Sequence, residues 1–370
     1  MDHVNKQDDY SLIIPLLVTN GDVGTKGKEE QYTNNTAIGT ASFISTCFNA
    51  LNALSGVGIL SIPYALASGG WLTLILLLVI ASSTFFTGLL IQRCMDSDPT
   101  IRTYPDIGER AFGKAGRTLI SISMKIELYL VATASGVLAS VIILCSVFWA
   151  GAFDGIGFQE KGNIVKWNGV PSAISLYAFC YCAHPVFPTL YTSMKNQRQF
   201  TKVLFFCFAF STITYSLMAV IGYLMFGSKV ESEITLNLPT NKLSSRVAIF
   251  TTLVTPIAKY ALMLTPIVDT IETQFQSFCN KRKCSFLIRT ILMISTVVFG
   301  NLMSLVGALL SATASITIPC LCYLKISGIY KRIGMEMIIV WFVGLIGLIV
   351  AVVGTYVSLV HLKTHLFVAI

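Results

Sequence analysis

Long runs of apolar residues, separated by short polar segments, fill the chain from residue 40 onward. A membrane-spanning α-helix needs about 20 consecutive, mostly apolar residues. Six runs of this kind read as single spans, namely 40–67, 70–92, 171–194, 203–227, 247–268 and 337–360. The pattern therefore predicts an all-α polytopic membrane protein.

Two longer runs, 118–153 and 290–324, are interpreted from their flanking charges, because cytoplasmic loops collect Lys and Arg. Basic residues lie on both sides of 290–324, which predicts a pair of spans with both ends in the cytoplasm. Basic residues precede 118–153, but the following segment 154–169 holds two acids and two lysines. We expect this run to be one long crossing, which gives nine spans in total.

The basic residues also predict the orientation. Of 26 Lys and Arg residues, 18 lie in the N-terminal tail and the loops assigned to the cytoplasm, six lie on the opposite side, and two lie within spans. This asymmetry places the N-terminus in the cytoplasm. Residues 1–39 are polar and poor in aromatics, which predicts a disordered cytoplasmic tail before a transporter domain at 40–365.

Composition excludes several classes of function. The chain is 54% hydrophobic with a mean hydropathy of +0.72. Its net charge of +8 comes from short loops between spans, so nucleic acid is not an expected partner. Most of the ten cysteines lie inside apolar runs and show no ligand spacing, so we expect neither a metal nor another cofactor. No catalytic motif is present, which argues against an enzyme.

Two spans carry helix-breaking residues near their middle. Ser-Gly-Val-Gly occupies 55–58, and Tyr-Cys-Ala-His-Pro occupies 181–185. Unwound backbone in a membrane must be buried in protein or line a cavity, and paired breaks typically mark the binding site of a secondary transporter. The helix start near Gly58 suits a carboxylate, and carbonyls at 181–183 suit an ammonium group, so an amino acid fits both. The alternative is a glycine-mediated helix contact and an ordinary proline kink.

Several segments resemble the amino acid/auxin permease family, and within it the plant vacuolar amino acid transporter branch. They are NALSGVGILSIPYALA (52–67), LYAFCYCAHPVFPTLYTS (176–193), GYLMFG (222–227), ITLNLP (234–239) and KYALMLTP (259–266). The resemblance implies a LeuT-like inverted-repeat fold with eleven spans, of which helices 1 and 6 are broken. It also implies proton-coupled transport of amino acids across the vacuolar membrane, with amino acid, protons and membrane lipid as partners.

The resemblance places the substrate site at Asn52, Ser55, Gly56, Val57, Gly58, Tyr181, Cys182, Ala183 and His184. His184 is expected to be either a proton-sensitive gate or a helix-end cap. Lys259 lies near the middle of its span, where a charge is expensive and usually functional. It is a candidate for proton coupling, as is Glu127; alternatively Lys259 is a structural residue paired with Glu127 or with unwound carbonyls.

The first repeat departs from the family pattern. Counted from 41 to 153 it has 113 residues, whereas the second repeat, from 172 to 327, has 156, so the first is short by about two spans. Residues 127–130 resemble the third span of the family and 135–141 resemble the fifth. The missing segment is therefore expected between Thr133 and Ser135, and a transport-incompetent isoform acting as an amino acid sensor or regulator is the alternative function.

Overall fold

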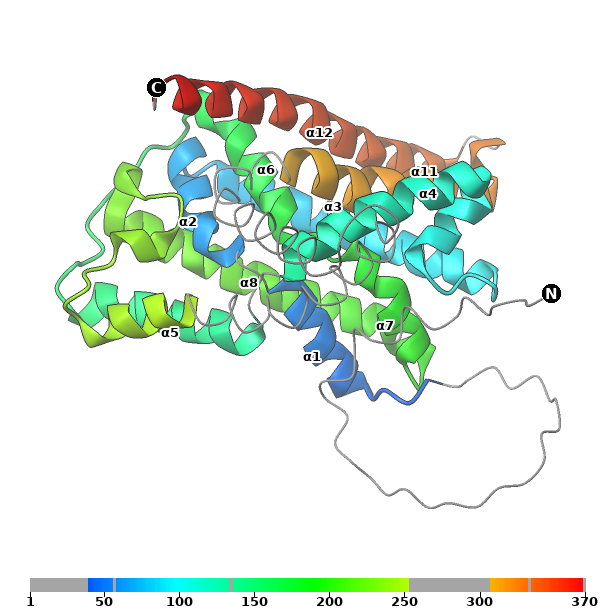
Figure 1. Ribbon diagram of the computed structural model, residues 1–370, viewed down its shortest axis with the longest axis horizontal. Coiled ribbons are helices and arrows are strands. Elements are labelled where there is room, and N and C mark those ends of the chain that lie inside the picture. The colour runs from blue at the N-terminus through cyan, green and yellow to red at the C-terminus, as the bar shows by residue number, and fades with distance from the viewer. Residues whose placement is uncertain (1–38, 56–57, 133–135, 253–306, 332–333, 369–370) are drawn as a thin grey trace, which may run out of the picture. The chain divides into compact units, whose positions relative to one another are not determined.

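The computed structural model describes residues 39–55, 58–132, 136–252, 307–331 and 334–368 (Figure 1). These residues form helices joined by turns and by longer loops such as 154–166. The longer helices are α1 (Phe43–Leu54), α2 (Gly58–Gly69), α3 (Thr73–Ser97), α4 (Tyr104–Ala132), α5 (Val137–Phe153), α6 (Val170–Cys180), α7 (Phe187–Ser193), α8 (Phe200–Phe226), α11 (Ile318–Ser327) and α12 (Met335–Val368).

The described helices confirm the prediction of an all-α polytopic membrane protein. Five helical stretches are long and apolar enough to cross a membrane: Thr73–Ser97, Trp167–Ser193, Gln197–Lys229, Leu309–Ser327 and Met335–Val360. The pair α1 and α2, which is bent by 51°, makes a sixth span if it is counted as one. The predicted span 247–268 and the first member of the pair within 290–324 lie largely outside the described residues.

The run 118–153 is two helices rather than one continuous rod. α4 ends at Ala132, and α5 begins at Val137 after an extended Gly136 (φ −75°, ψ 174°). α4 packs against α11 and α3, whereas α5 packs against α8 and α1 (Figure 1). The run is therefore interrupted between Ala132 and Gly136, and its expected single crossing stays a prediction.

Both helix interruptions expected from the sequence occur. The first span stops at Leu54, and its cap residue Ser55 is extended before α2 begins. In the second span α6 ends at Cys180, and the helix resumes with a 3₁₀ turn, η3 (His184–Val186), followed by α7. Pro185 and Pro188 sit in the first turns of η3 and α7, where a missing N–H is tolerated.

Protein surrounds the first break because α2 lies inside the bundle. α2 packs against both α6 and α8, and nearly all of its side chains are buried. Close approach to α8 depends on Gly222, where a Cβ would lie 2.6 Å from the Cβ of Pro63. Large apolar side chains such as Ile75 on α3 and Val352 on α12 instead face outward, where lipid is the expected solvent.

A short backbone bridge joins the outer ends of the two interrupted spans. Ala41, just before α1, donates its N–H to the carbonyl of Ser193 at 2.9 Å, and Lys195 donates its N–H to the carbonyl of Ala41 at 3.0 Å. We call this bridge the clasp. The clasp holds the residues just before α1 against the end of α7. It lies at the end of the bundle that is predicted to face the cytoplasm.

Side chains tie the same end of the bundle together. Tyr191 of α7 donates its hydroxyl to Asp96 of α3. Arg93 of α3 forms a 2.6 Å salt bridge with Glu336 of α12, whose carboxylate also accepts from the hydroxyl of Tyr323. The Arg93 and Glu336 side chains are half exposed, so this pair contributes little stability by itself and serves mainly to fix helix positions.

Substitution of Gly39 is expected to open the clasp. A Cβ at this position would lie 2.4 Å from the carbonyl carbon and oxygen of Ser193, and backbone atoms cannot rotate away. We expect Gly39→Val to increase the hydrogen-exchange rate of the Ala41 and Lys195 amides by about tenfold or more. Thr40→Ala, at an exposed neighbouring position, is the control; equal exchange in the two variants would contradict the expectation.

Candidate functional site

The candidate site lies where the two interrupted spans meet. Gly58, the first residue of α2, is so close to α6 that a Cβ on it would lie 2.6 Å from the sulfur of Cys180. Ser55 is buried at the end of α1 and donates its N–H to Leu51. Glycine at position 58 therefore brings the start of α2 into contact with the end of α6.

The backbone of the second break turns back on itself. The N–H groups of Tyr181, Cys182 and Ala183 donate to carbonyls two or three positions earlier in the chain, those of Ala178, Phe179 and Tyr181 respectively. These bonds are 3.0–3.3 Å long. The amides of the break are thus paired locally, which leaves the last carbonyl of α6 to find a donor elsewhere.

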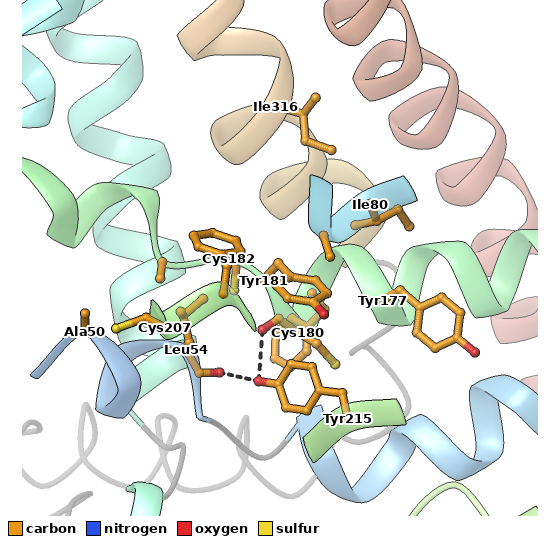
Figure 2. Close-up of a cluster of buried hydrophobic side chains, with 14 of the residues drawn as sticks. Ala50, Leu54, Ile80, Tyr177, Cys180, Tyr181, Cys182, Cys207, Tyr215 and Ile316 are labelled. Atoms are coloured by element: carbon orange, nitrogen blue, oxygen red, sulfur yellow. Dashed lines mark hydrogen bonds between the residues drawn. The ribbon is translucent and has the colours of Figure 1, made fainter. Parts of the chain in front are cut away.

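That donor is Tyr215 of α8. Its hydroxyl lies 2.5 Å from the carbonyl oxygen of Leu54, at the end of α1, and 3.2 Å from that of Cys180, at the end of α6. Figure 2 shows both contacts converging on the hydroxyl. One side chain therefore links the ends of both interrupted helices. Sequence reasoning did not find this residue.

Tyr181 forms an aromatic wall beside this point. Its ring stacks on Phe208 with centroids 5.8 Å apart and meets Tyr215 edge-on at 5.5 Å. Its hydroxyl pairs with the Thr212 hydroxyl at 2.8 Å, and the side chain is 0% exposed. Edge-to-face and offset contacts of this kind fix ring positions. The predicted residue Tyr181 is therefore next to the two carbonyls, with its hydroxyl turned toward α8.

Asn52 lies in α1 and contacts a third helix end. Its side-chain oxygen accepts the N–H of Val137 at 2.9 Å, in the first turn of α5. Gly136 has no side chain to cap this helix, so Asn52 performs the cap from a distance. In the described arrangement this predicted substrate residue stabilises α5, and its contact with a substrate stays a prediction.

His184 points toward other helices. The ring is 0% exposed, and Nε2 lies 2.9 Å from both the Thr84 carbonyl and the Thr87 hydroxyl of α3. The Thr87 hydroxyl in turn lies 2.7 Å from the carbonyl of Ser315 in the π-helical turn η8 (Thr313–Thr317). The side chain thus bonds to α3 instead of capping its own helices, and the gating role stays a prediction.

The remaining predicted residues are only partly visible. Gly56, Val57 and Lys259 lie outside the described residues, as does the side chain of Glu127. Among the described residues, Ser55, Gly58, Tyr181, Cys182 and Ala183 gather at the two breaks, and all are buried. The arrangement offers two helix C-terminal carbonyls and one hydroxyl at a single point, which suits a group with several N–H donors.

Comparison with known proteins identifies the class of membrane protein. The family described as "Transmembrane amino acid transporter protein" matches residues 39–143 and 123–360. The chain belongs to this family. Membership of the transmembrane amino acid transporter family confirms the resemblance to the amino acid/auxin permeases, and a transporter family agrees with the expectation that the chain is not an enzyme.

Curated relatives in Arabidopsis thaliana are similar over most of their length. Amino acid transporter AVT1J is 51% identical, with 86% of this chain and 90% of the relative covered. Amino acid transporter AVT1I is 50% identical, with 87% and 95% covered. Amino acid transporter AVT1E is 33% identical, with 87% and 74% covered.

The alignments contain positions that this chain lacks. The match to AVT1J extends over 383 positions, whereas 86% of 370 residues is about 318, so about 65 positions have no counterpart here. The match to AVT1I extends over 386 positions and covers 87% of this chain. It leaves nearly the same number of positions without a counterpart here. The two family matches also overlap at 123–143, around the expected junction. A segment missing near this point would produce both observations.

Proposed function

We propose that the protein is a proton-coupled secondary transporter of amino acids in the vacuolar membrane or another endomembrane. The observation that carries the proposal is the convergence of the Leu54 and Cys180 carbonyls at the meeting point of two interrupted spans. Interrupted helices of this kind bind substrate in secondary transporters. The names of the relatives support amino acids as the substrate class.

The proposed binding mode uses both breaks. The N-terminal N–H groups of α2 would hold the substrate carboxylate, because a helix N-terminus favours an anion. The carbonyls at the ends of α1 and α6 would accept from the ammonium group. The residues proposed to contact or gate the substrate are Asn52, Ser55, Gly56, Val57, Gly58, Tyr181, Cys182, Ala183 and His184.

The proposed architecture is an inverted repeat with the N-terminus in the cytoplasm. The first repeat would run from 41 to 153 and the second from 172 to 327, followed by the final span 337–360. One bundle would rock against the other around a fixed site, as in other transporters with interrupted helices. The clasp would then close the cytoplasmic end in the described arrangement.

Uptake by proteoliposomes tests the proposal. The chain is reconstituted with an imposed pH gradient, and uptake of each of the twenty radiolabelled L-amino acids is compared with that of protein-free liposomes. We expect gradient-dependent uptake of at least one amino acid, slow or absent in the native chain and faster after the repair described in the Discussion. We expect none by Gly56→Val, whose side chain would block the approach to the α2 N-terminus. Absence of both binding and uptake, also after the repair described in the Discussion, would exclude the function.

The short first repeat favours one alternative, an isoform that binds amino acids and senses or regulates without transporting them. About 65 aligned positions are absent, and Asn52 caps α5 in the described arrangement. Saturable binding without uptake, in both the native and the repaired chain, would support the sensor. Uptake by the repaired chain supports the transporter.

Replacement of Lys259 is expected to uncouple transport from protons. A charge at the middle of a span costs from ~3 to ~10 kcal/mol, so such a residue is usually kept for function. We expect Lys259→Met to abolish the dependence of uptake on the pH gradient while the protein stays in the membrane. Lys325→Met, at an exposed position near the end of α11, is the control. Unchanged gradient dependence would return Lys259 to a structural role.

A further inference from the structure

The Tyr215 hydroxyl has more hydrogen-bond acceptors around it than it has hydrogens to donate. A tyrosine hydroxyl has a single hydrogen to donate. The structure nevertheless places two carbonyl oxygens within reach of it, that of Leu54 at 2.5 Å and that of Cys180 at 3.2 Å. Tyr215 is 1% exposed, so water does not supply a second donor from bulk solvent. The two carbonyls therefore share one hydrogen.

Both carbonyls need donors for the same reason. Leu54 and Cys180 are the last residues of α1 and α6, and the last carbonyls of a helix have no partner within it. Among the described residues, Tyr215 is the group that donates to either of them. An unpaired carbonyl inside a membrane protein costs several kcal/mol. Two helix C-termini also bring partial negative charge to this point, which attracts a cation.

The surroundings fix the hydroxyl between the two helix ends. The ring of Tyr215 meets Tyr181 edge-on, and Tyr181 is itself stacked on Phe208 and bonded to Thr212. Phe208, Thr212 and Tyr215 all belong to α8, so one helix supplies the hydroxyl and the groups that hold its neighbour. In Figure 2 the Tyr215 side chain reaches from α8 toward the gap between α1 and α6.

We propose that Tyr215 is a positioning residue whose hydroxyl stands in for the substrate ammonium group in the ligand-free protein. The inference rests on the proposed function. An ammonium group has three N–H donors, so it can donate a hydrogen bond to each carbonyl. The hydroxyl has one hydrogen and can donate a full hydrogen bond to only one of them. Substrate binding then releases Tyr215 from the two helix ends, and Tyr215 competes with the substrate for the same carbonyls.

Competition predicts an increase in affinity when the hydroxyl is removed. Tyr215→Phe leaves both carbonyls without a donor in the ligand-free protein. A ligand that donates to them then binds more tightly, because it no longer has to displace the hydroxyl. We expect the dissociation constant of the amino acid to fall roughly two- to tenfold, the range that corresponds to one net hydrogen bond. The unfolding temperature without ligand is expected to fall. A purely structural role of Tyr215 predicts a lower unfolding temperature without tighter amino acid binding.

The experiment measures ligand-dependent thermal unfolding of the full chain in lipid nanodiscs. The twenty L-amino acids are tested singly on the native chain, and the strongest binder is titrated against the variants. Tyr177→Phe is the matched control, because Tyr177 is also buried and its hydroxyl pairs with Thr73 at 3.2 Å, away from the two carbonyls. The N,N,N-trimethyl derivative of the same amino acid, which keeps the charge but has no N–H, is expected to bind the native chain about tenfold more weakly or not at all.

A second measurement keeps the inference testable if Tyr215→Phe does not fold. 3-Fluorotyrosine at position 215 alone makes that hydroxyl more acidic and a stronger donor, so the labelled native chain is expected to bind the amino acid about twofold more weakly. An unchanged or raised dissociation constant in Tyr215→Phe, or tighter binding by the labelled chain, overturns the inference alone. Failure of every amino acid to bind the native chain overturns this inference, and the same failure in the repaired chain, together with absence of uptake, overturns the proposed function as well.

Discussion

Insertion of the aligned AVT1J segment between Thr133 and Ser135 is expected to raise amino acid uptake by about tenfold or more. α5 has 17 residues, about 26 Å at 1.5 Å per residue, which is less than the roughly 30 Å of hydrocarbon in a bilayer. Its N-terminus relies on Asn52 for a cap. The absent spans would supply part of the scaffold against which the moving bundle rocks, so the native chain is expected to insert but to transport poorly or not at all.

Two controls separate added spans from added length. A Gly-Ser linker of the same length at the same position lengthens the chain without supplying helices, and it is expected to leave uptake low. Gly56→Val in the repaired chain is expected to abolish the gain. Uptake is measured in proteoliposomes with a pH gradient and normalised to reconstituted protein. Equal rates for the native and repaired chains would show that the missing segment is dispensable.

Gly58→Ala is expected to weaken amino acid binding by about tenfold or more, and Cys180→Ala is expected to restore it. The added Cβ would lie 2.6 Å from the Cys180 sulfur, closer than such contacts occur, so the start of α2 must move away from α6. Once the sulfur is removed, the nearest Cys180 atoms are 3.4 Å away, an ordinary van der Waals distance. The double variant is therefore expected to bind within about threefold of the native chain.

Amino acid binding is measured by the same titrations for two control variants of the Gly58 and Cys180 contact. Cys180→Ala alone removes one buried sulfur and is expected to change the dissociation constant by less than about threefold. Gly334→Ala places the same methyl group where nothing lies within 4 Å and is expected to have no effect. If Gly58→Ala binds normally, or if the double variant binds no better than Gly58→Ala, close contact between α2 and α6 is not required for binding.

Local sequence signals predicted the spans and their interruptions. Apolar length identifies α3, α8 and α12, and the Gly and Pro residues at 56–58 and 185–188 mark where helices stop. Hydropathy does not show where a helix is interrupted, however. The run 118–153 therefore did not reveal that α4 and α5 are separate helices that pack on different neighbours. A local signal for the interruption was Gly136, which directly precedes α5.

The contacts that complete the candidate site depend on tertiary structure. Tyr215 lies in an apolar span and differs little from other aromatic residues there; its role appears only when α1, α6 and α8 converge. The bond between Asn52 and Val137 likewise joins residues far apart in the sequence. For His184 the sequence indicated a polar residue at a break, but its partners in α3 and η8 follow from helix packing.

The clasp offers a spectroscopic ruler for the motion of this bundle. Because it joins backbone atoms of Ala41, Ser193 and Lys195, side chains at its edge are free to be replaced. Thr40 and Lys195 are exposed, so nitroxide labels on these two positions would leave both hydrogen bonds in place. Electron paramagnetic resonance would then measure a short distance between the two nitroxides when this end of the bundle is closed and a longer distance when it is open. Opening can be followed in lipid before any substrate is identified.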